Sequence, residues 1–178
     1  MKEFLYSSFD LACIINSMDL GARETGRLLE ELFYKDRFFL ESYYRNDKRK
    51  LYLDVYYWLD YLSDKPTIDA EFPSIQKDFD AYGKKIAEES FIIEYFDLDL
   101  FFKKMRLQLL FLGNQDFIRM KLRTMLRAYG YKRRSEKLLQ YLKDSLLFYH
   151  IETYVRGGAE CSISEIGLDE MITFRICG

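Results

Sequence analysis

The sequence predicts an α+β fold: a mainly helical N-terminal part, a short β segment, and a C-terminal part in which two helices precede a β-hairpin. Apolar residues recur at helical spacing through most of the chain. The pattern becomes β-like in FIIEYF and FFKKMRLQLLFL, and it alternates again on both sides of Gly157-Gly158. With 178 residues and 49% hydrophobic content, the chain is long enough for one full core or two small ones.

Helices are expected over most of the first 63 residues. Ser8 is placed to cap a short helix through Asn16, and Asp19 is placed to cap a second helix. RFFLESYYRNDKRK fits either a continuation of that helix or a strand. The apolar residues at helical spacing in the second and third helices are Leu28, Leu29, Leu32, Phe33, Leu51, Val55, Trp58 and Leu62.

The segment SDKPTIDAEFPS contains both prolines of the chain and is the expected linker. Pro73 or Ser74 then opens another helix, to about Glu89. The composition changes after this region. The sequence therefore divides into a helical, acidic, aromatic-rich part, residues 1–100, and a basic part, residues 101–178.

The basic part is expected to open with a strand over FFKKMRLQLLFL, because apolar and polar residues alternate there. The apolar face of this strand consists of Met105, Leu107, Leu109 and Phe111. GNQD is typical of a turn, and Asp116 is a natural N-cap for a helix that continues to Tyr129. Ile118, Leu122, Met125, Leu126 and Tyr129 would then share one helix face.

Gly130 stands where a helix-ending glycine belongs, and Ser135 is placed to cap a second helix, Glu136 to about Tyr149. Gly157-Gly158 is a two-residue hairpin signal, and DEMITFRI is the last expected strand. One core should hold this part together. The residues expected to be buried in it are Leu122, Leu126, Leu138, Leu142, Leu146 and Phe174.

Two helices joined by a glycine-containing turn and followed by a hairpin are the order of a winged helix-turn-helix. LRTMLRAYGYKRRSEKLLQYLKDSLLFYHIETYV resembles the winged helices of bacterial multidomain and defence-island proteins, over about residues 116–176. Their pattern is matched by Leu122, Met125-Leu126, Gly130, Arg133-Arg134, Ser135, Ile151 and Thr153, with a methionine in place of the second leucine. The resemblance implies the fold, and a phage or host-defence setting. Such modules bind DNA, RNA or protein.

Charge is distributed unevenly along the chain. Residues 1–100 carry 13 basic and 21 acidic residues, a net charge of −8. Residues 101–140 carry 11 basic and 2 acidic residues, a net charge of +9, and residues 141–178 carry 3 and 6, a net charge of −3. The basic block is suited to nucleic acid, to an acidic protein partner, or to the chain's own acidic part.

Eight cations form the candidate nucleic-acid site. On the expected helix, Arg119, Arg123 and Arg127 are four residues apart and would form one stripe. The others are Lys132, Arg133, Arg134, Lys137 and Arg156. The second helix offers Gln140 as its one typical base-reading residue, so contacts with the phosphate backbone are favoured over a base code. The alternative is that these cations simply form a solvated surface.

Catalysis is not expected from this sequence, and neither a cofactor nor a metal is predicted. His150 is the single histidine, expected to be partly buried at a helix end, and Cys13, Cys161 and Cys177 do not combine with it at a zinc-binding spacing. No phosphate-binding glycine motif is present. Asp97 and Asp99 either mark a turn between two strands, which is favoured, or pair to hold Mg²⁺.

These features predict a cytoplasmic protein with free thiols and no membrane contact, because the apolar runs are far shorter than the roughly 20 residues that span a bilayer. The favoured function is nucleic-acid-associated regulation through backbone contacts. The alternative is a protein-interaction or inhibitor module, with the winged helix as its scaffold. In the favoured reading the acidic, aromatic-rich N-terminal part docks on the winged helix, forms a homodimer or binds a partner, and in the alternative its aromatic surface binds the protein partner. A weaker third reading is an enzyme that binds a small ligand at the tyrosine-rich surface.

Overall fold

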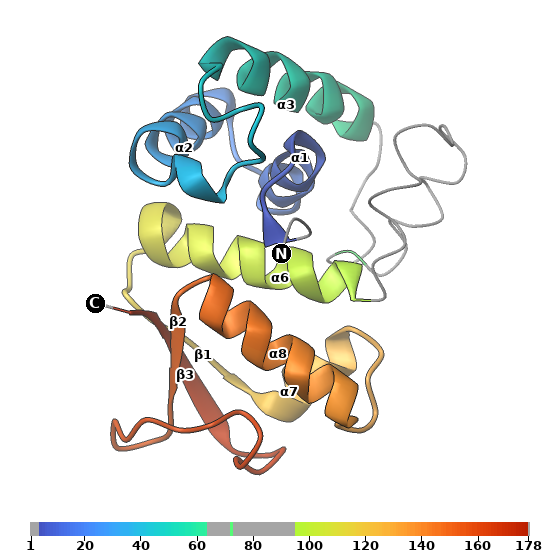
Figure 1. The fold of residues 1–178 in the computed structure, drawn as a ribbon, viewed down its shortest axis with the longest axis vertical. Coiled ribbons are helices and arrows are strands. Elements are labelled where there is room, and N and C mark those ends of the chain that lie inside the picture. The colour runs from blue at the N-terminus through green and yellow to red at the C-terminus, as the bar shows by residue number, and fades with distance from the viewer. Residues whose placement is uncertain (1–3, 64–71, 73–94, 178) are drawn as a thin grey trace. The chain divides into compact units, whose positions relative to one another are not determined.

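The computed structural model describes residues 4–63, 72 and 95–177, which belong to two compact units, residues 1–103 and 104–178 (Figure 1). The predicted α+β class is confirmed, because the described residues form helices and a three-stranded antiparallel sheet. Most of the expected linker, the helix from Pro73 and most of FIIEYF lie outside the described residues. None of the helices described is long and apolar enough to cross a membrane.

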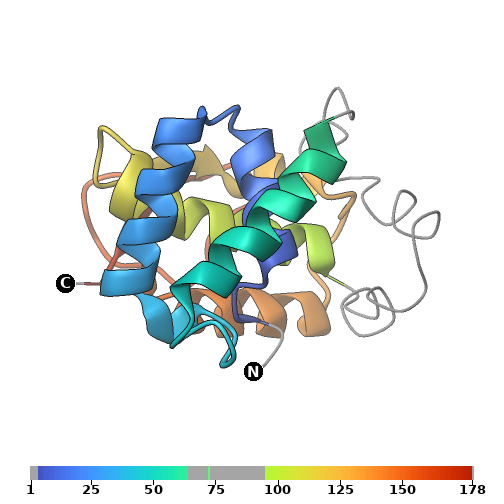
Figure 2. The same ribbon diagram turned by 90° about the horizontal axis from the view of Figure 1, so that it is seen from above.

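Unit 1, residues 1–103, contains α1 (Ser8–Ser17), α2 (Ala22–Lys35), the short 3-10 helix η2 (Arg37–Phe39) and α3 (Lys48–Ser63). Figure 2 shows α3 passing across α1, and the rings of Phe9 and Trp58 meet edge to face between them, 4.9 Å apart. The predicted apolar stripe of α3 is confirmed. Its four residues, Leu51, Val55, Trp58 and Leu62, are all buried.

The two predicted caps in unit 1 are wrong. Ser7, not Ser8, caps α1: its hydroxyl accepts from the Asp10 amide at 3.1 Å, and the Asp10 carboxylate accepts from the Ser7 amide at 2.9 Å. The N-cap of α2 is Gly21, not Asp19, whose φ of 51° is left-handed. In both helices the true cap is the residue whose amide meets a carboxylate three positions later.

The expected strand over FFKKMRLQLLFL is wrong, because these residues continue α6 (Phe96–Leu107) into one π-helical turn, η3 (Gln108–Leu112). Asp97 and Asp99 consequently lie in the first turn of α6, not between two strands. Lys104 and Arg106 belonged to the polar face of the expected strand, yet both are buried. A helix that buries charged side chains beside apolar ones loses the pattern by which a helix is identified.

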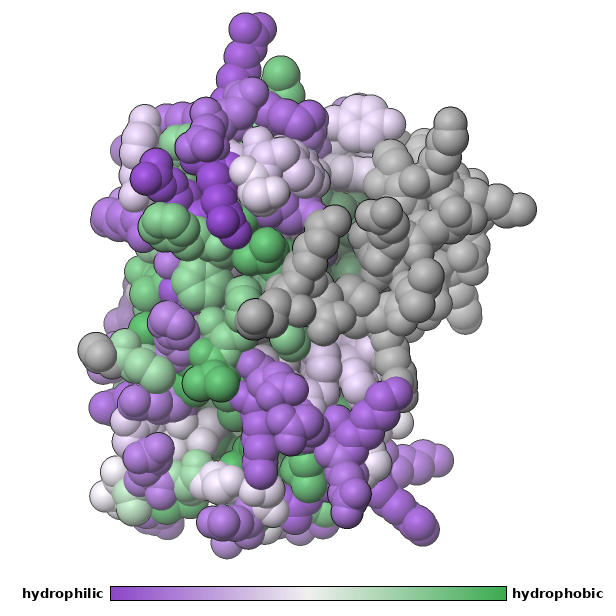
Figure 3. All heavy atoms as spheres, in the orientation of Figure 1, coloured by the Kyte–Doolittle hydropathy of each residue, from purple (hydrophilic) through white to green (hydrophobic). Residues whose placement is uncertain are grey.

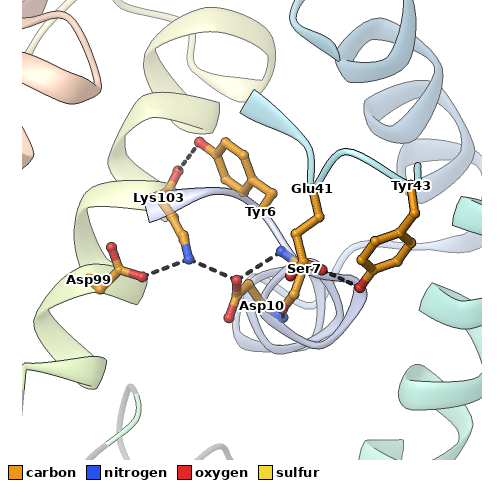
Figure 4. Close-up of polar contacts among 7 residues, drawn as sticks. All are labelled: Tyr6, Ser7, Asp10, Glu41, Tyr43, Asp99 and Lys103. Carbon is orange, nitrogen blue, oxygen red and sulfur yellow. Dashed lines mark hydrogen bonds and ion pairs between the residues drawn. The ribbon is translucent and has the colours of Figure 1, made fainter. Parts of the chain in front are cut away.

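Lys103 forms a buried ionic cluster with Asp10 of α1 and Asp99 of α6 (Figure 4). Its ammonium lies 2.7 Å from the Asp10 carboxylate and 2.6 Å from that of Asp99. Burial by itself would lower the pKa of Lys103, but the two carboxylates outweigh burial and raise that pKa above its ordinary value. The Tyr6 hydroxyl also donates to the Lys103 carbonyl, so α6 is tied to the first residues of unit 1 twice.

Unit 2, residues 104–178, is built on a sheet of three strands in the order β1-β3-β2. Its elements after η3 are β1 (Ile118–Lys121), α7 (Leu122–Ala128), α8 (Glu136–Phe148), β2 (Ile151–Tyr154) and β3 (Met171–Ile176). The central strand, β3, is antiparallel to both neighbours, with Thr173 opposite Arg119 on one side and opposite Tyr154 on the other.

The helix predicted from Asp116 to Tyr129 is only half correct. Residues 118–121 are the strand β1, and the helix α7 begins at Leu122 and ends at Ala128. The apolar positions Ile118 and Met120 also fit a strand, and pairing with β3 decides between the two. As a consequence, Arg119 lies on the sheet and does not continue a helical stripe with Arg123 and Arg127.

The predicted break between α7 and α8 is confirmed. Gly130 has a φ of 81°, the Tyr131 amide donates to the Leu126 carbonyl, and the Gly130 amide donates to the Arg127 carbonyl. These two bonds are the Schellman ending of a helix. Ser135 caps α8 as predicted, because its hydroxyl accepts from the Leu138 amide at 3.2 Å.

The chain leaves β2 through a turn at Gly157 and Gly158, as predicted, and both glycines have positive φ. The turn is closed by the Val155 amide, which donates to the Ala159 carbonyl at 2.9 Å. The partner strand of the expected hairpin is different, however. β2 pairs over its length with β3, while the segment directly after the turn contributes one bridge, between Tyr154 and Glu160.

The six-residue core predicted for the C-terminal part is confirmed, since Leu122, Leu126, Leu138, Leu142, Leu146 and Phe174 are all buried. His150 is exposed, which corrects the expectation of partial burial, and it ends α8 with a left-handed φ of 52°. All three cysteines are free thiols, as predicted. Burial, then the charges of Asp10 and Asp97, raise the pKa of the Cys13 thiol well above its ordinary value.

Leu142→Ala should destabilise the protein by about 2–5 kcal/mol, because it removes a fully buried side chain and leaves a cavity. Leu147→Ala, on the same helix but 78% exposed, is the matched control and should cost less than about 0.5 kcal/mol. Chemical denaturation measures both. Equal losses for the two variants would contradict the face of α8 described here.

Lys103→Met should cost about 3–5 kcal/mol, because two buried carboxylates lose their cation. The control is Lys50→Met, which removes an exposed ion pair with Asp54 at 3.2 Å and should cost about 0–1 kcal/mol. Free energies of unfolding from urea titrations give the comparison. A loss at position 103 no larger than that at position 50 would contradict burial of the cluster.

Candidate nucleic-acid interface

The two units carry net charges of opposite sign. Unit 1 carries 14 basic and 21 acidic residues, a net charge of −7, and unit 2 carries 13 basic and 8 acidic residues, a net charge of +5. In Figure 3, hydrophilic side chains cover the part of unit 2 where Figure 1 places α8 and the turn before it. The eight predicted site residues all belong to unit 2, but their surroundings separate them into distinct groups.

The first group, which we call the turn cluster, consists of Arg127, Lys132 and Arg133, all exposed at or beside the turn from α7 to α8. Arg127 and Lys132 line a cavity of about 510 Å³ together with Arg123, Leu126, Gly130, Tyr131 and Leu168. Among the residues that the structure describes, no hydrogen bond or ion pair involves the three side chains of the turn cluster. Their charges are therefore available to a ligand.

Arg123 lies beside the turn cluster, but its charge is neutralised. Its Nε and Nη2 donate to the two carboxylate oxygens of Asp169, at 2.6 and 2.7 Å. Donation to the Asp169 carboxylate, then the charge of that carboxylate, raises the pKa of Arg123, and the same hydrogen bonding lowers the pKa of Asp169. The Arg123 amide also donates to the Leu168 carbonyl at 2.7 Å, so this arginine holds the segment before β3 against α7.

Arg134 has a structural role, unlike its neighbour Arg133. Its guanidinium donates to the carbonyls of Ile163 and Ile166, at 3.2 and 2.7 Å, and these residues are themselves buried. The contact ties the long connection between β2 and β3 to the start of α8. Arg134 therefore stabilises the fold and is a poor candidate for phosphate contact.

The remaining arginines of the predicted site lie on the sheet. Arg119 in β1 and Arg156 in the turn after β2 line a second cavity, of about 480 Å³, which we call the sheet pocket. Arg175 of β3 lines the same pocket, although the sequence-based set leaves it out. Its place in the alternation of MITFRI, two residues after Thr173, was the available signal that it shares a face with Arg119.

The exposed face of α8 offers little for reading bases. Gln140 donates its amide to the Asp144 carboxylate at 2.8 Å, one turn later on the helix. Lys137 and Lys143 are exposed on the same helix, and Leu147 is 78% exposed near its end. Asp169 was missed by the sequence because it meets Arg123 across 46 positions, and no local pattern marks such a pair.

No family model, curated protein or solved structure matches this chain. The resemblance of residues 116–176 to winged helices therefore stays a prediction. The position and surroundings of the cations in unit 2 are the features that bear on function.

Arg134→Ala should destabilise the protein by about 1–3 kcal/mol, because two part-buried carbonyls lose a charged donor. Arg133→Ala removes the same charge from the adjacent position and should change stability by less than about 0.5 kcal/mol. Thermal and urea unfolding of the two variants provide the test. An effect of Arg133→Ala equal to that of Arg134→Ala would contradict the separate roles.

Proposed function

We propose that unit 2 is a winged helix-turn-helix module that binds nucleic acid, mainly through the phosphate backbone. The order β1–α7–turn–α8–β2–β3 supports the fold assignment, with the β2–β3 connection as the wing. The sheet order β1-β3-β2 supports it as well, since it brings the strand before the two helices next to the last strand. The function proposed is binding and regulation, without a catalytic step.

The observation that carries the proposal is the turn cluster. Two of the cations around this turn already have partners: Arg123 pairs with Asp169, and Arg134 donates to two carbonyls. Arg127, Lys132 and Arg133 are exposed and remain available to a ligand. Cations placed at a helix–turn–helix and beside a wing are suited to neighbouring phosphates of one duplex. Arg156, exposed in the wing turn, is the fourth residue of this surface.

Binding should depend weakly on base sequence. Arginine, asparagine and glutamine are the usual base-reading side chains, and Gln140 of α8 is held by Asp144 on its own helix. Backbone contacts position a protein on nucleic acid without reading the sequence. The module is therefore expected to bind duplexes of different sequence with similar affinity.

Exposed aromatic residues in unit 1 favour a second function, recognition of a protein. Tyr34, Phe38 and Tyr57 are 65%, 71% and 63% exposed. Aromatic side chains are enriched at the centres of protein interfaces, where they bury much area at low conformational cost. In that case unit 2 would serve as the scaffold and its basic surface would face an acidic partner.

Duplex binding of the full chain at increasing salt tests the proposal. Replacing Arg127, Lys132 and Arg133 together with alanine should weaken binding to every duplex alike and should reduce the salt slope by up to about 3 units, one per lost phosphate contact. Stability should change little, because the three side chains are exposed. Fluorescence anisotropy with a random-sequence duplex measures the affinities.

The matched control replaces three exposed arginines of unit 1, Arg23, Arg37 and Arg49, with alanine, which changes the net charge equally. This control should retain the salt slope of the unmodified protein. Equal losses of duplex affinity in both triple variants would mean that only net charge matters, and would overturn the assignment of binding to the turn. Absence of duplex binding at low salt would overturn nucleic-acid binding and favour the protein-recognition function.

A further inference from the structure

The sheet pocket brings three arginines together from three separate segments of unit 2. Arg119 comes from β1, Arg156 from the turn after β2, and Arg175 from β3. The cavity has a volume of about 480 Å³. The other residues that line it are Tyr154, Val155, Gly157, Gly158, Met171 and Thr173, so no acidic side chain is among them.

Two of these guanidinium groups are positioned by neighbouring side chains. The Nε of Arg119 donates to the Thr173 hydroxyl at 3.1 Å, and its guanidinium lies 4.6 Å from the centre of the Phe117 ring. The guanidinium of Arg175 lies 5.8 Å from the same ring and 6.0 Å from that of Tyr154. Aromatic faces attract guanidinium groups, so these two cations are held beside the cavity before any ligand arrives.

Within the described part of the chain, no ion pair involves Arg119, Arg156 or Arg175. Glu152 stands opposite Arg175 in the β2–β3 pairing, and its carboxylate accepts a hydrogen bond from the Tyr154 hydroxyl. Three cations around one cavity repel one another, and an anion placed between them would remove this cost. A phosphate, with several acceptor oxygens, suits more than one guanidinium fork.

The volume of the pocket and the residues that line it indicate a ligand larger than inorganic phosphate. Its volume lies in the range of about 300–1,000 Å³ that is usual for small-molecule sites. Tyr154 offers a ring on which a planar group can stack, and Met171 is 44% exposed beside it. A Cβ at Gly157 or Gly158 would meet no atom within 4 Å, so the rim formed by the wing turn is open.

We propose that the sheet pocket binds one nucleotide unit, with its phosphate between Arg119, Arg156 and Arg175 and its base against Tyr154 and Met171. The unit is either a free nucleotide or one residue of a single strand, because both present the same chemistry. This site goes beyond the proposed function: it lies on the sheet and not at the turn, and Arg156 is the one residue common to both.

Isothermal titration calorimetry of the full chain with adenosine monophosphate tests the site directly. Replacing Arg119 and Arg175 together with glutamine should weaken binding by about 100-fold, roughly tenfold for each charged hydrogen-bonding partner lost. The control replaces Lys121 and Lys143 with glutamine. Both lysines are exposed and neither lines the pocket, so the same change in charge should leave the affinity within about twofold.

Arg175→Lys is a second variant, which keeps the charge but loses the planar fork and should bind several-fold more weakly. Far-ultraviolet circular dichroism of each variant establishes that it is folded. Adenosine without phosphate should bind at least tenfold more weakly than the monophosphate, and inorganic phosphate should compete poorly because it leaves the stacking surface empty. Inorganic phosphate competing as well as the nucleotide would overturn the nucleotide assignment, and unchanged affinity in the double variant would overturn the site.

A single-stranded oligonucleotide separates the two sources of the ligand. Binding of the strand that is lost in the double variant and displaced by the monophosphate would assign the site to a strand, and binding of the monophosphate alone would assign it to a free nucleotide. Duplex binding by the turn cluster should persist in the double variant. If the double variant lost duplex binding as strongly as nucleotide binding, the pocket would be part of the duplex-binding surface, and the proposal of a separate site would be overturned.

Discussion

Strand β3 pairs with β1 on one side and β2 on the other, and the organisation of unit 2 depends on this double pairing. Because residues 118–121 pair with β3, they form a strand and not the start of the predicted helix. Arg119 therefore lies on the sheet and not on α7. The same pairing also sets Arg119 and Arg175 on one face of the sheet, which creates the sheet pocket. Both α7 and α8 begin and end within the loop of chain that the β1–β3 pairing closes.

Cations that are close together in the sequence have three different roles in the structure. Lys103 is buried between two carboxylates, and Arg106 donates to the Tyr149 carbonyl in the interior of unit 2. Arg123 and Arg134 hold the connection that leads to β3. The turn cluster and the arginines of the sheet pocket remain for a ligand. The functional proposals therefore rest on the environment of each cation and not on the charge of the segment.

Local patterns in the sequence predicted the parts of the fold that local physics controls. Ser135 and Gly130 were identified as helix ends because a hydroxyl cap and a left-handed exit are properties of a few adjacent residues. Two predictions failed where the deciding partner is distant in sequence. The segment FFKKMRLQLLFL, expected as a strand, is helical, and the cations that imitated an exposed strand face, Lys104 and Arg106, are buried. The start of the helix expected from Asp116 is instead a strand, because residues 118–121 pair with β3, 50 or more residues later in the sequence.

The sequence by itself determined the α+β class, the six-residue core of the C-terminal part, the break at Gly130 and the return at Gly157-Gly158. These features follow from side-chain volume, apolar spacing and backbone conformation, which act over one or two turns of chain. Only the tertiary structure decided which cations are available. Arg123 and Arg127 are indistinguishable in the sequence pattern, yet Asp169 neutralises the first and leaves the second free of any ion pair among the described residues. Ion pairing depends on the distance between two groups in space, and the fold sets that distance.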